Sequence, residues 1–492
     1  MLLTDAIVSV AETLPERPAV VDARGTTSYG RLLRLVATYA GHLRSTREDG
    51  CVGALCDPSA EFVATYLAAM ATGRTLVPIN ERLPDSQLVR LLRDCNCTAI
   101  LCQDSWEGRA SRLSSLCSLP EAPVVLDALE AAGPEPDESL GDGRLRDRVV
   151  CFYTASVTGS PCGALLTHGN LVSTVEEMLD LAPMGEEDVF ATAMPVWHPY
   201  GALLGCLLPL AAGARVIICP AASSECVARA LEVHKPTFLV APNTVISRLA
   251  TLPHVDSGGR LRFAMCSGDT VSAEVHACFE ERYHARVIEG YGVTEAAALT
   301  TCNPFGGDRR VGTVGRPLPN QTVRIADDHM NLAPVGDVGE IIIRGPNVMA
   351  GYLNRPEDTL AVLNEGWLHT GDLAWEDSDQ FLHFVGRKRD LIVVDGLNVY
   401  PGHVETVLEG LEGILDACVI GVRDADVGEA PKAVLVVDES SAPSDEWILA
   451  QCGEHLAEYE LPKAIARVPR LPRTTAGHIS RATVAYLYGR SL

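Results

Sequence analysis

Short apolar runs alternate with helix-length amphipathic segments over most of this chain, and that alternation restricts the folds open to it. The runs at 51–56, 98–103, 214–220 and 285–292 are rich in Val, Ile, Ala and Cys, and the segments between them carry apolar residues at helical spacing. Apolar strands separated by helices are typical of an α/β sheet with both faces covered. We therefore expect a large N-terminal region of α/β fold.

The sequence pattern changes towards the C-terminus. From about residue 313 to residue 387, Gly and Pro punctuate β segments, which predicts a β-rich subdomain. The charged cluster at 386–390 then precedes a unit with helices and strands of its own. A charged cluster between apolar units is typical of a linker. We expect an N-terminal domain at 1–387 and a small α/β domain at 388–492.

Composition limits the partners and the compartment. The 492 residues carry a formal net charge of −24, which argues against the basic face that nucleic-acid binding needs. The 16 cysteines include no C-x-x-C pair, as expected of reduced thiols in a cytosolic protein. The N-terminus lacks the pattern of a signal peptide, and the apolar stretch 201–214 is too short to span a bilayer, so we interpret it as buried core. We expect a cytoplasmic protein that spans no membrane and binds no nucleic acid.

A loop of small and hydroxylated residues follows the apolar run 149–152. Residues 153–163 read YTASVTGSPCG, and such a loop after a strand presents backbone N–H groups and hydroxyls to a phosphate. On its own the pattern is common. The loop resembles the Y-T-S-G-T-T-G-x-P-K-G signature of the adenylate-forming superfamily, which includes acyl-CoA ligases, luciferases and peptide-synthetase adenylation domains.

Further segments resemble motifs of that superfamily and come in its order. They are T-H-x-N at 167–170, P-x-F-H-x-x-G at 195–201, S-G-G at 267–269, Y-G-x-T-E at 291–295, G-W-x-x-T-G-D at 366–372, G-R-x-K-D at 386–390 and G-x-N-V-Y-P-x-x-V-E at 396–405. The resemblance covers essentially the whole chain. The chain is identified as a member of this superfamily, with the fold of its acyl-CoA ligases.

The resemblance implies a nucleotide site. It assigns AMP contacts to Gly268, Asp269, Thr270, Glu289, Gly290, Tyr291, Gly292, Thr294, Asp372, Phe384 and Arg387, and a phosphate loop to Thr154, Ala155, Ser156 and Thr158. A carboxylate such as Asp372 suits the ribose hydroxyls, and the planar fork of Arg387 suits ribose or phosphate oxygens. Thr294 can donate to the α-phosphate, and Glu295 is a hard oxygen ligand suited to Mg²⁺.

The resemblance also implies acyl and coenzyme A sites. It assigns the acyl pocket to His198, Tyr200, Gly201, Pro242, Asn243, Val293 and Ala296, the pantetheine tunnel to Gly396 and Leu397, and the hinge to Arg389. Amino-acid-activating relatives carry an Asp directly after the proline at 195, where this chain has Val196. The expected substrate is therefore an organic acid without an α-amino group.

Two departures from the family pattern fall on one half of the reaction. Residues 471–481, LPRTTAGHISR, resemble L-P-x-T-x-x-G-K-I-x-R, so His478 stands where the family has a catalytic lysine. In the phosphate loop, Cys162 replaces the lysine, Ser156 a glycine and Val157 a hydroxyl residue. Adenylation sets a carboxylate against a triphosphate and needs fixed positive charge, whereas a histidine is mostly neutral at pH 7. Thioester formation needs only that a thiol be delivered to an activated carbonyl.

We therefore expect an acid–thiol ligase that retains thioester formation and has lost, or nearly lost, adenylation. It would take an acyl-adenylate from a separate adenylating ligase and release acyl-CoA and AMP, with ATP and Mg²⁺ needed only if adenylation is retained. Three alternatives stay open: a complete two-step ligase in which a protonated His478 replaces the lysine, a nucleotide- or acid-binding pseudoenzyme that serves as a partner subunit, and amide or ester formation without coenzyme A. The acceptor is free coenzyme A or a stand-alone carrier protein.

Overall fold

The computed structural model describes residues 2–45, 50–132, 144–155, 161–220, 223–252, 255–267, 271–327, 329–394, 397–424, 427–438, 440–474 and 479–489. The chain divides into two compact units, one of residues 1–323 and 342–369 and the other of residues 324–341 and 370–492. The domain boundary expected after residue 387 stays a prediction. Within the described residues no helix is long and apolar enough to cross a membrane.

The first unit contains a nine-stranded sheet formed by described residues. Its order is β15 (Arg316–Pro317), β14 (Thr301–Cys302), β13 (Arg286–Tyr291), β12 (Phe263–Ser267), β11 (Phe238–Val240), β9 (Val189–Thr192), β10 (Arg215–Ile218), β1 (Pro18–Asp22) and β2 (Gly25–Ser28). The strands from β13 to β1 are parallel, and the pairs at both edges are antiparallel. Because parallel strands end at one edge, the loops after β9, β11, β12 and β13 begin beside one another.

A second sheet of the first unit has seven strands among the described residues. Its order is β18 (Gly351–Tyr352), β8 (Pro161–Thr167), β7 (Arg148–Ala155), β4 (Leu76–Pro78), β3 (Cys51–Leu55), β5 (Cys97–Cys102) and β6 (Val124–Val125). Strands β7 and β8 form an antiparallel hairpin, and β18 pairs antiparallel with β8.

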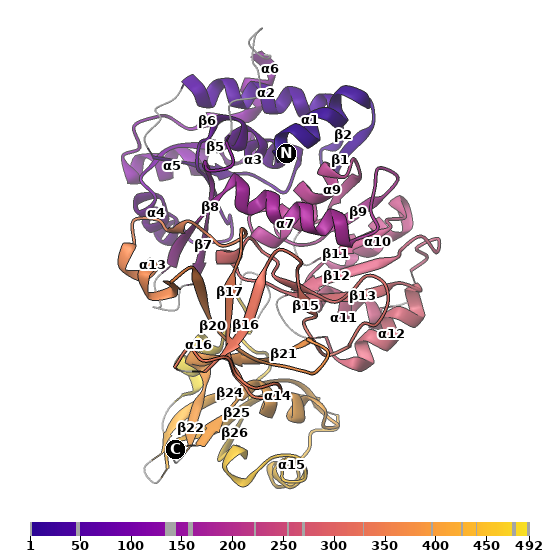
Figure 1. Ribbon diagram of the computed structural model, residues 1–492, viewed down its shortest axis with the longest axis vertical. Helices are drawn as coiled ribbons and strands as arrows, with labels where there is room; N and C mark the ends of the chain where they lie inside the picture. The colour runs from indigo at the N-terminus through magenta and orange to yellow at the C-terminus, as the bar shows by residue number, and fades with distance from the viewer. Residues whose placement is uncertain are drawn as a thin grey trace. The chain divides into compact units, whose positions relative to one another are not determined.

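Helices pack against both sheets of this unit. They are α1 (Leu3–Thr13), α2 (Tyr29–Ser45), α3 (Ala60–Thr72), α4 (Asp85–Asp94), α5 (Glu107–Cys117), α6 (Leu126–Ala132), α7 (His168–Leu181), α8 (Pro199–Ala202), α9 (Leu208–Ala211), α10 (Ser224–His234), α11 (Asn243–Thr251), α12 (Ala273–Tyr283) and α13 (Pro356–Val362). Helices α11 and α12 lie side by side near β12 and β13 (Figure 1). The strands are buried on both faces: Val189 and Ala191 of β9 join the apolar cluster with α10 to α12, while Phe190 between them stacks on Phe238 with ring centroids 4.4 Å apart.

The apolar stretch expected as buried core does lie in the core. It contains α9 and a π-helical turn, Leu203–Leu207, which continues from α8. Every residue of that turn is buried. A π-helical turn is rare and tends to lie near functional sites.

Further strands follow along the chain, in agreement with the expected β-rich stretch. A third sheet has the order β16 (Thr322–Ala326), β17 (Gly339–Arg344), β20 (Trp367–Glu376) and β19 (Leu363–Asn364), and β21 (Leu382–Arg387) pairs with β20. A fourth has the order β23 (Leu397–Val399), β22 (Ile392–Val394), β25 (Gly428–Val437) and β24 (Ile414–Asp424), with β26 (Ala464–Arg467) beside β25. Helices α14 (Pro401–Glu409), α15 (Asp445–Cys452) and α16 (Arg481–Tyr488) accompany the fourth sheet. The architecture is thus mixed α/β, as the sequence predicts.

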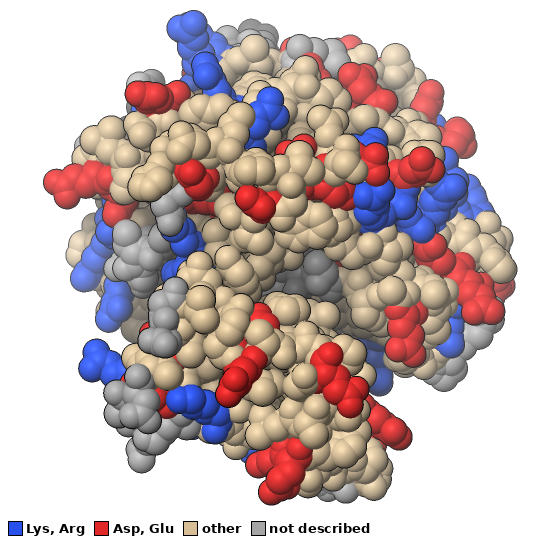
Figure 2. Space-filling model, turned by 60° about the horizontal axis from the view of Figure 1, so that its bottom comes forward, with Lys and Arg blue, Asp and Glu red and all other residues tan. Residues whose placement is uncertain are grey.

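On the face shown in Figure 2, acidic and basic side chains are interspersed. All sixteen cysteines lie within the described residues, and all are free thiols.

Candidate functional site

The turn after β13 presents the predicted phosphate and metal residues. Strand β13 ends at Tyr291, and the 3₁₀ turn Thr294–Ala296 follows. A Cβ on Gly292 would lie 2.0 Å from the Ala298 carbonyl oxygen, so only glycine fits there. Ala297 and Ala298 have φ of 49° and 75°, a left-handed backbone that alanine rarely adopts. Such strain is typical of functional sites, and here it turns the chain so that Thr294 and Glu295 are both partly exposed.

Hydrogen bonds fix both the side chain and the backbone carbonyl of Glu295. The Tyr352 hydroxyl donates to Glu295 Oε1 at 2.7 Å, and the Met349 amide donates to the Glu295 carbonyl at 2.8 Å. Burial, with the charge of Glu295 adding to it, raises the pKa of Tyr352, so the hydroxyl stays a donor. No cluster of three or more His, Cys, Asp and Glu side chains that could hold a metal occurs in the described part of the chain. Mg²⁺ is commonly bound through one or two carboxylates plus phosphate oxygens and waters, so Glu295 fits such an ion as the protein's carboxylate ligand.

The segment that holds Glu295 is itself held by Asn170. Its Nδ2 donates to the carbonyls of Pro346 and Val348 at 2.7 and 2.8 Å. Asn170 also completes a capping box with Thr167 at the start of α7, which fixes its rotamer. Asn170 of the T-H-x-N motif therefore holds the segment whose Met349 amide bonds to Glu295, the predicted metal ligand. Sequence reasoning missed Tyr352, because it lies 57 residues from Glu295 and no local pattern marks it.

The phosphate loop lies between β7 and β8. Thr154 pairs with Cys162 and Ala155 with Pro161 in the hairpin, and Ser156, Val157 and Thr158 lie outside the described residues. Cys162 is fully buried, and its Sγ lies 3.9 Å from Asp358 Oδ2 of α13. Arg355 is 3.7 Å from the same carboxylate and 3.3 Å from Asp94. The side chain at position 162, where the family has a lysine, thus faces a cluster formed by Asp358, Arg355 and Asp94.

The acyl residues come from loops at the same sheet edge. His198 caps α8, its Nδ1 accepting from the Tyr200 amide at 3.2 Å. Tyr200 is buried, and a Cβ on Gly201 would lie 2.1 Å from the Pro195 carbonyl oxygen, so this turn requires glycine. Val196 is fully buried, and its carbonyl accepts from the Tyr66 hydroxyl at 2.7 Å.

The remaining predicted acyl residues lie in the loops after β11 and β13. Pro242 and Asn243 begin α11 after β11, and Val293 and Ala296 belong to the turn after β13. A narrow apolar gap, too small to hold a water molecule, lies beside Pro199 and Ala297. It is lined by Tyr66, Phe152, Leu171, Pro199, Ala202, Leu203, Leu207 and Ala297.

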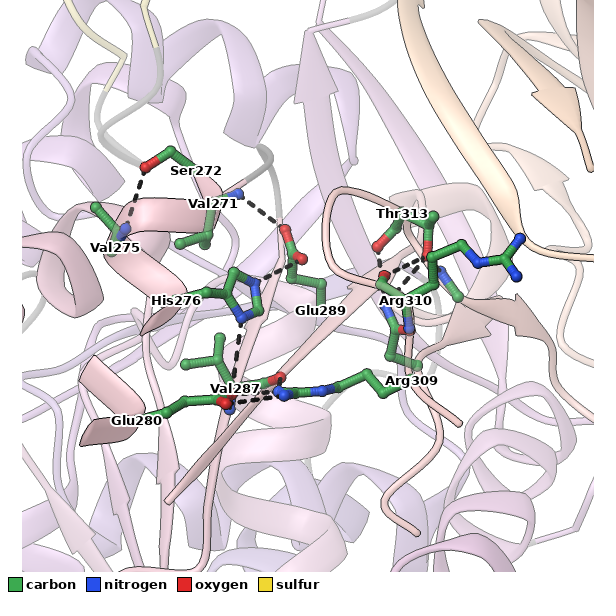
Figure 3. A network of polar contacts seen from close by, with 12 residues as sticks. Val271, Ser272, Val275, His276, Glu280, Val287, Glu289, Arg309, Arg310 and Thr313 are labelled. Carbon is green, nitrogen blue, oxygen red and sulfur yellow. Dashed lines mark hydrogen bonds and ion pairs between the residues drawn. The ribbon is translucent and has the colours of Figure 1, made fainter. Parts of the chain in front are cut away.

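Glu289, one of the predicted AMP contacts, lies on β13. Its carboxylate is buried; Oε1 accepts from the Val271 amide at 2.8 Å, and Oε2 lies 2.8 Å from His276 Nε2 (Figure 3). The side chain of this predicted AMP contact is therefore committed to a network inside the protein. Gly290 and Tyr291 follow it on β13. Gly268, Asp269 and Thr270 lie outside the described residues.

The second unit carries the predicted ribose residues on neighbouring strands. Asp372 of β20 and Arg387 of β21 are register partners, and Arg387 Nε lies 3.4 Å from Asp372 Oδ1. The Asp372 side chain is 7% exposed and that of Arg387 is 51% exposed. Phe384 lies on β21, paired with Ala374. An acidic oxygen and an exposed guanidinium fork are thus placed together, as ribose binding needs.

The hinge and tunnel residues also lie in the second unit. Arg389 belongs to a 3₁₀ turn, Lys388–Asp390, and Asp390 Oδ2 lies 3.4 Å from Arg481 Nε. Arg481 also donates to Glu405 Oε2 at 3.0 Å, so residues of three sequence motifs meet at one ion-pair cluster. Leu397 is half exposed, while Gly396 and His478 lie outside the described residues.

Comparison with known proteins shows the family of this chain. Residues 8–353 match the family described as AMP-binding enzyme, and residues 403–478 match the AMP-binding enzyme C-terminal domain. The chain is 33% identical over 485 residues to a feruloyl-CoA synthase of Amycolatopsis sp, covering 97% of each chain. It is 30% identical over 505 residues to the sulfoacetate–CoA ligase of Cupriavidus necator, covering 97% of this chain and 96% of the relative.

Solved structures are similar over almost the whole chain. The ATP-bound MatB of Rhodopseudomonas palustris superposes with a TM-score of 0.91 at 28% identity, with 99% of each chain covered. The amide bond synthetase McbA of Marinactinospora thermotolerans superposes with a TM-score of 0.89 at 27% identity, again with 99% of each chain covered. By sequence and by fold, this chain belongs to the adenylate-forming superfamily of AMP-binding enzymes, among its acyl-CoA ligases.

Proposed function

We propose that this acyl-CoA ligase forms acyl-CoA from an acyl-adenylate and coenzyme A, and that its adenylation of the free acid by ATP is lost or strongly impaired. The thiolate of coenzyme A attacks the acyl carbonyl, the C–S bond forms, and the C–O bond to the phosphate breaks so that AMP leaves with the electron pair. The thiol proton goes to solvent. The observation that carries the proposal is His478 in the place of a catalytic lysine.

The charge requirement separates the two half-reactions. Adenylation brings two anions together, and losing one preorganised donor typically costs about 10²–10³ in rate. A histidine is shorter than a lysine and, at an ordinary pKa near 6.5, is mostly neutral at pH 7. Attack of a thiol on an acyl-adenylate requires no such cation between two anions, because the acyl group is already activated.

The rest of the site supports retention of nucleotide binding. The Asp372–Arg387 pair offers ribose a carboxylate and a guanidinium fork, and Glu295 is fixed on its backbone and side chain. A pseudoenzyme that does not need to bind nucleotide has no reason to retain both of these arrangements. This supports catalysis over a purely structural partner role.

Cys162 favours a second candidate, a complete two-step ligase. Because its Sγ faces Asp358, a lysine at this position would pair with that carboxylate rather than extend a lone charge towards phosphate. Loss of the loop lysine then has little bearing on adenylation, and the question rests on His478. In this candidate the phosphate charge protonates His478, which replaces the lysine.

The acyl pocket supports an apolar or aromatic acid as the substrate. Val196 is buried in the position where amino-acid-activating relatives carry a carboxylate, so nothing there would hold an α-ammonium group. The side chains packed beside this turn, among them Tyr66, Phe152 and Leu203, are apolar or aromatic. Ferulate, named in a similar synthase, is an aromatic acid of this kind and heads the panel to be tested.

The test compares two routes to one product. The protein is incubated with coenzyme A and either acid, ATP and Mg²⁺, or the synthetic acyl-adenylate alone, and acyl-CoA is followed by mass spectrometry. Product from the adenylate alone, with His478→Lys raising the ATP-dependent rate at least tenfold, is the expected result. Equal product by both routes establishes the complete ligase instead.

Two further experiments distinguish the remaining alternative functions. An amine in place of coenzyme A yields an amide only if the protein resembles the amide bond synthetase in chemistry as well as in fold. A pantetheine-loaded carrier protein competes with free coenzyme A if a carrier is the acceptor. A protein that binds AMP but forms no product by any route is a pseudoenzyme.

A further inference from the structure

A buried histidine–carboxylate pair links helix α12 to the strand that leads into the nucleotide turn. His276 of α12 and Glu289 of β13 are each 3% exposed, and His276 Nε2 lies 2.8 Å from Glu289 Oε2. The other oxygen, Oε1, accepts from the Val271 amide at 2.8 Å. Figure 3 shows the carboxylate between these two donors. We assign the ring proton to Nε2, so that the imidazole donates to Glu289 Oε2.

A second carboxylate lies behind the imidazole. Glu280 Oε1 is 3.7 Å from His276 Nδ1 and accepts from the Val287 amide at 2.8 Å. Arg309 donates to Glu280 Oε2 at 2.8 Å and to the Val287 carbonyl at 2.6 Å. Burial alone would raise the pKa of Glu280, but the Arg309 hydrogen bond lowers it, so this carboxylate stays ionised. The imidazole thus lies between two acidic side chains: it is hydrogen-bonded to Glu289, while its Nδ1 is buried with no hydrogen-bond partner among the described residues.

The position of Glu289 gives this network access to two nucleotide segments. Glu289 directly precedes Gly290 and Tyr291, and its carbonyl accepts from the Asn303 amide at 2.8 Å. Val271, which its side chain holds, directly follows the segment 268–270 that we expect along adenine. One carboxylate therefore ties Val271 to the strand that ends at Tyr291.

We propose that His276 is a positioning residue for the nucleotide: it holds Glu289 so that Oε1 fixes the Val271 amide. This inference rests on the proposed function, because it assumes that both segments bind AMP. Without the imidazole, a buried carboxylate loses its only side-chain donor in Figure 3 and either takes up a proton or turns away. The Val271 amide then loses a fixed acceptor.

The test measures AMP affinity by titration calorimetry, a quantity that does not depend on which half-reaction is retained. His276→Leu fills the space without a donor, and we expect it to weaken AMP binding at least tenfold. His276→Gln keeps a side-chain N–H and should restore most of the affinity. Phe279→Leu is the matched control, because Phe279 is buried on the same helix but belongs to the apolar cluster instead. It should lower Tm and leave AMP affinity within twofold.

A second readout follows the Val271 amide directly. Hydrogen exchange of a peptide covering this amide should speed up at least tenfold in His276→Leu and stay unchanged in Phe279→Leu, each compared without nucleotide. Unchanged AMP affinity and exchange in His276→Leu, or equal losses in Phe279→Leu, would overturn the positioning role. Absence of AMP binding by the unsubstituted protein would instead overturn the proposed function, and the exchange measurement would still decide the role of His276.

Discussion

The Tyr352 hydroxyl donates a 2.7 Å hydrogen bond to Oε1 of Glu295, the carboxylate expected to bind Mg²⁺. Tyr352 lies on β18, which pairs with β8 of the hairpin that bounds the phosphate loop. The bond therefore connects the metal residue to the strands that present the phosphate loop. It orients one oxygen of the carboxylate and leaves the other for a cation. A metal ligand oriented in this way is usually sensitive to loss of its partner.

Tyr352→Phe should weaken Mg²⁺-dependent ATP binding about tenfold, because a hydrogen bond to a charged group contributes about 1.5–3 kcal/mol. Calorimetric titration of ATP with and without Mg²⁺ measures this effect without any need for turnover. The rate of thioester formation from a synthetic adenylate should be unchanged, since that half-reaction does not involve the triphosphate. Equal loss of ATP affinity with and without Mg²⁺ would show that Tyr352 acts on folding rather than on Glu295.

Cys162→Lys should restore much less ATP-dependent activity than His478→Lys. The Cys162 side chain is fully buried and faces Asp358, so a lysine there would form an ion pair with that carboxylate. We expect less than a twofold gain in ATP-dependent acyl-CoA formation from Cys162→Lys, against at least tenfold from His478→Lys. A larger gain from Cys162→Lys would show that the loop, and not the C-terminal motif, limits adenylation. Asp358→Asn in the Cys162→Lys background separates a paired from a free lysine.

Much of the fold could be predicted from the sequence, because it follows from sheet geometry. The runs at 214–220 and 285–292 contain β10 and β13 of one parallel sheet, and parallel strands bring their following loops to one edge. The apolar stretch 201–214 lies in the core because its length and composition leave it no other place. These features depend on periodicity, which a single sequence displays.

The side-chain pairs that fix the site could not be predicted in the same way. Cys162 and Asp358 are 196 residues apart, and Glu295 and Tyr352 are 57 apart. Pairs of this kind depend on strand register between distant segments, for which one sequence carries no local signal. Sequence reasoning therefore identified Cys162 as the replacement of a phosphate-loop lysine but could not predict that its side chain lies against the Asp358 carboxylate.

Glu177 should make the protein less stable as the pH rises. It is 1% exposed on α7; burial raises its pKa to about 7, although Gln321 donates to Oε2 at 3.1 Å. Between the ordinary value of 4.5 and about 7, the folded chain keeps a proton that the unfolded chain has released. The contribution of this proton to the free energy of unfolding is therefore fully present below pH 4.5 and is lost as the pH rises through about 7. At about 1.4 kcal/mol per pH unit, the loss amounts to about 3 kcal/mol.

Glu177→Gln tests that dependence, because it keeps the shape and removes the titration. Urea unfolding at pH 5 and pH 8 should show the variant gaining about 3 kcal/mol relative to the original chain at the higher pH. The neighbouring Glu176, which is exposed, provides the control substitution Glu176→Gln, with no such pH-dependent gain. Equal behaviour of the two variants would show that Glu177 is ionised in the folded chain at both pH values.

Cys226 should be the thiol most easily alkylated near neutral pH. A hydrogen bond from the buried Cys219 thiol, aided by Arg229, lowers the pKa of Cys226 to about 7, and its amide lies at the capped start of α10. The same bond raises the pKa of Cys219. Since the thiolate is the nucleophile, the iodoacetamide rate at Cys226 should reach half its maximum near pH 7, as measured by peptide mass spectrometry. Cys219→Ala removes the donor and should move that midpoint towards the ordinary thiol value of about 8.5. A midpoint that Cys219→Ala leaves unchanged would show that Arg229 and the start of the helix lower the pKa of Cys226 instead.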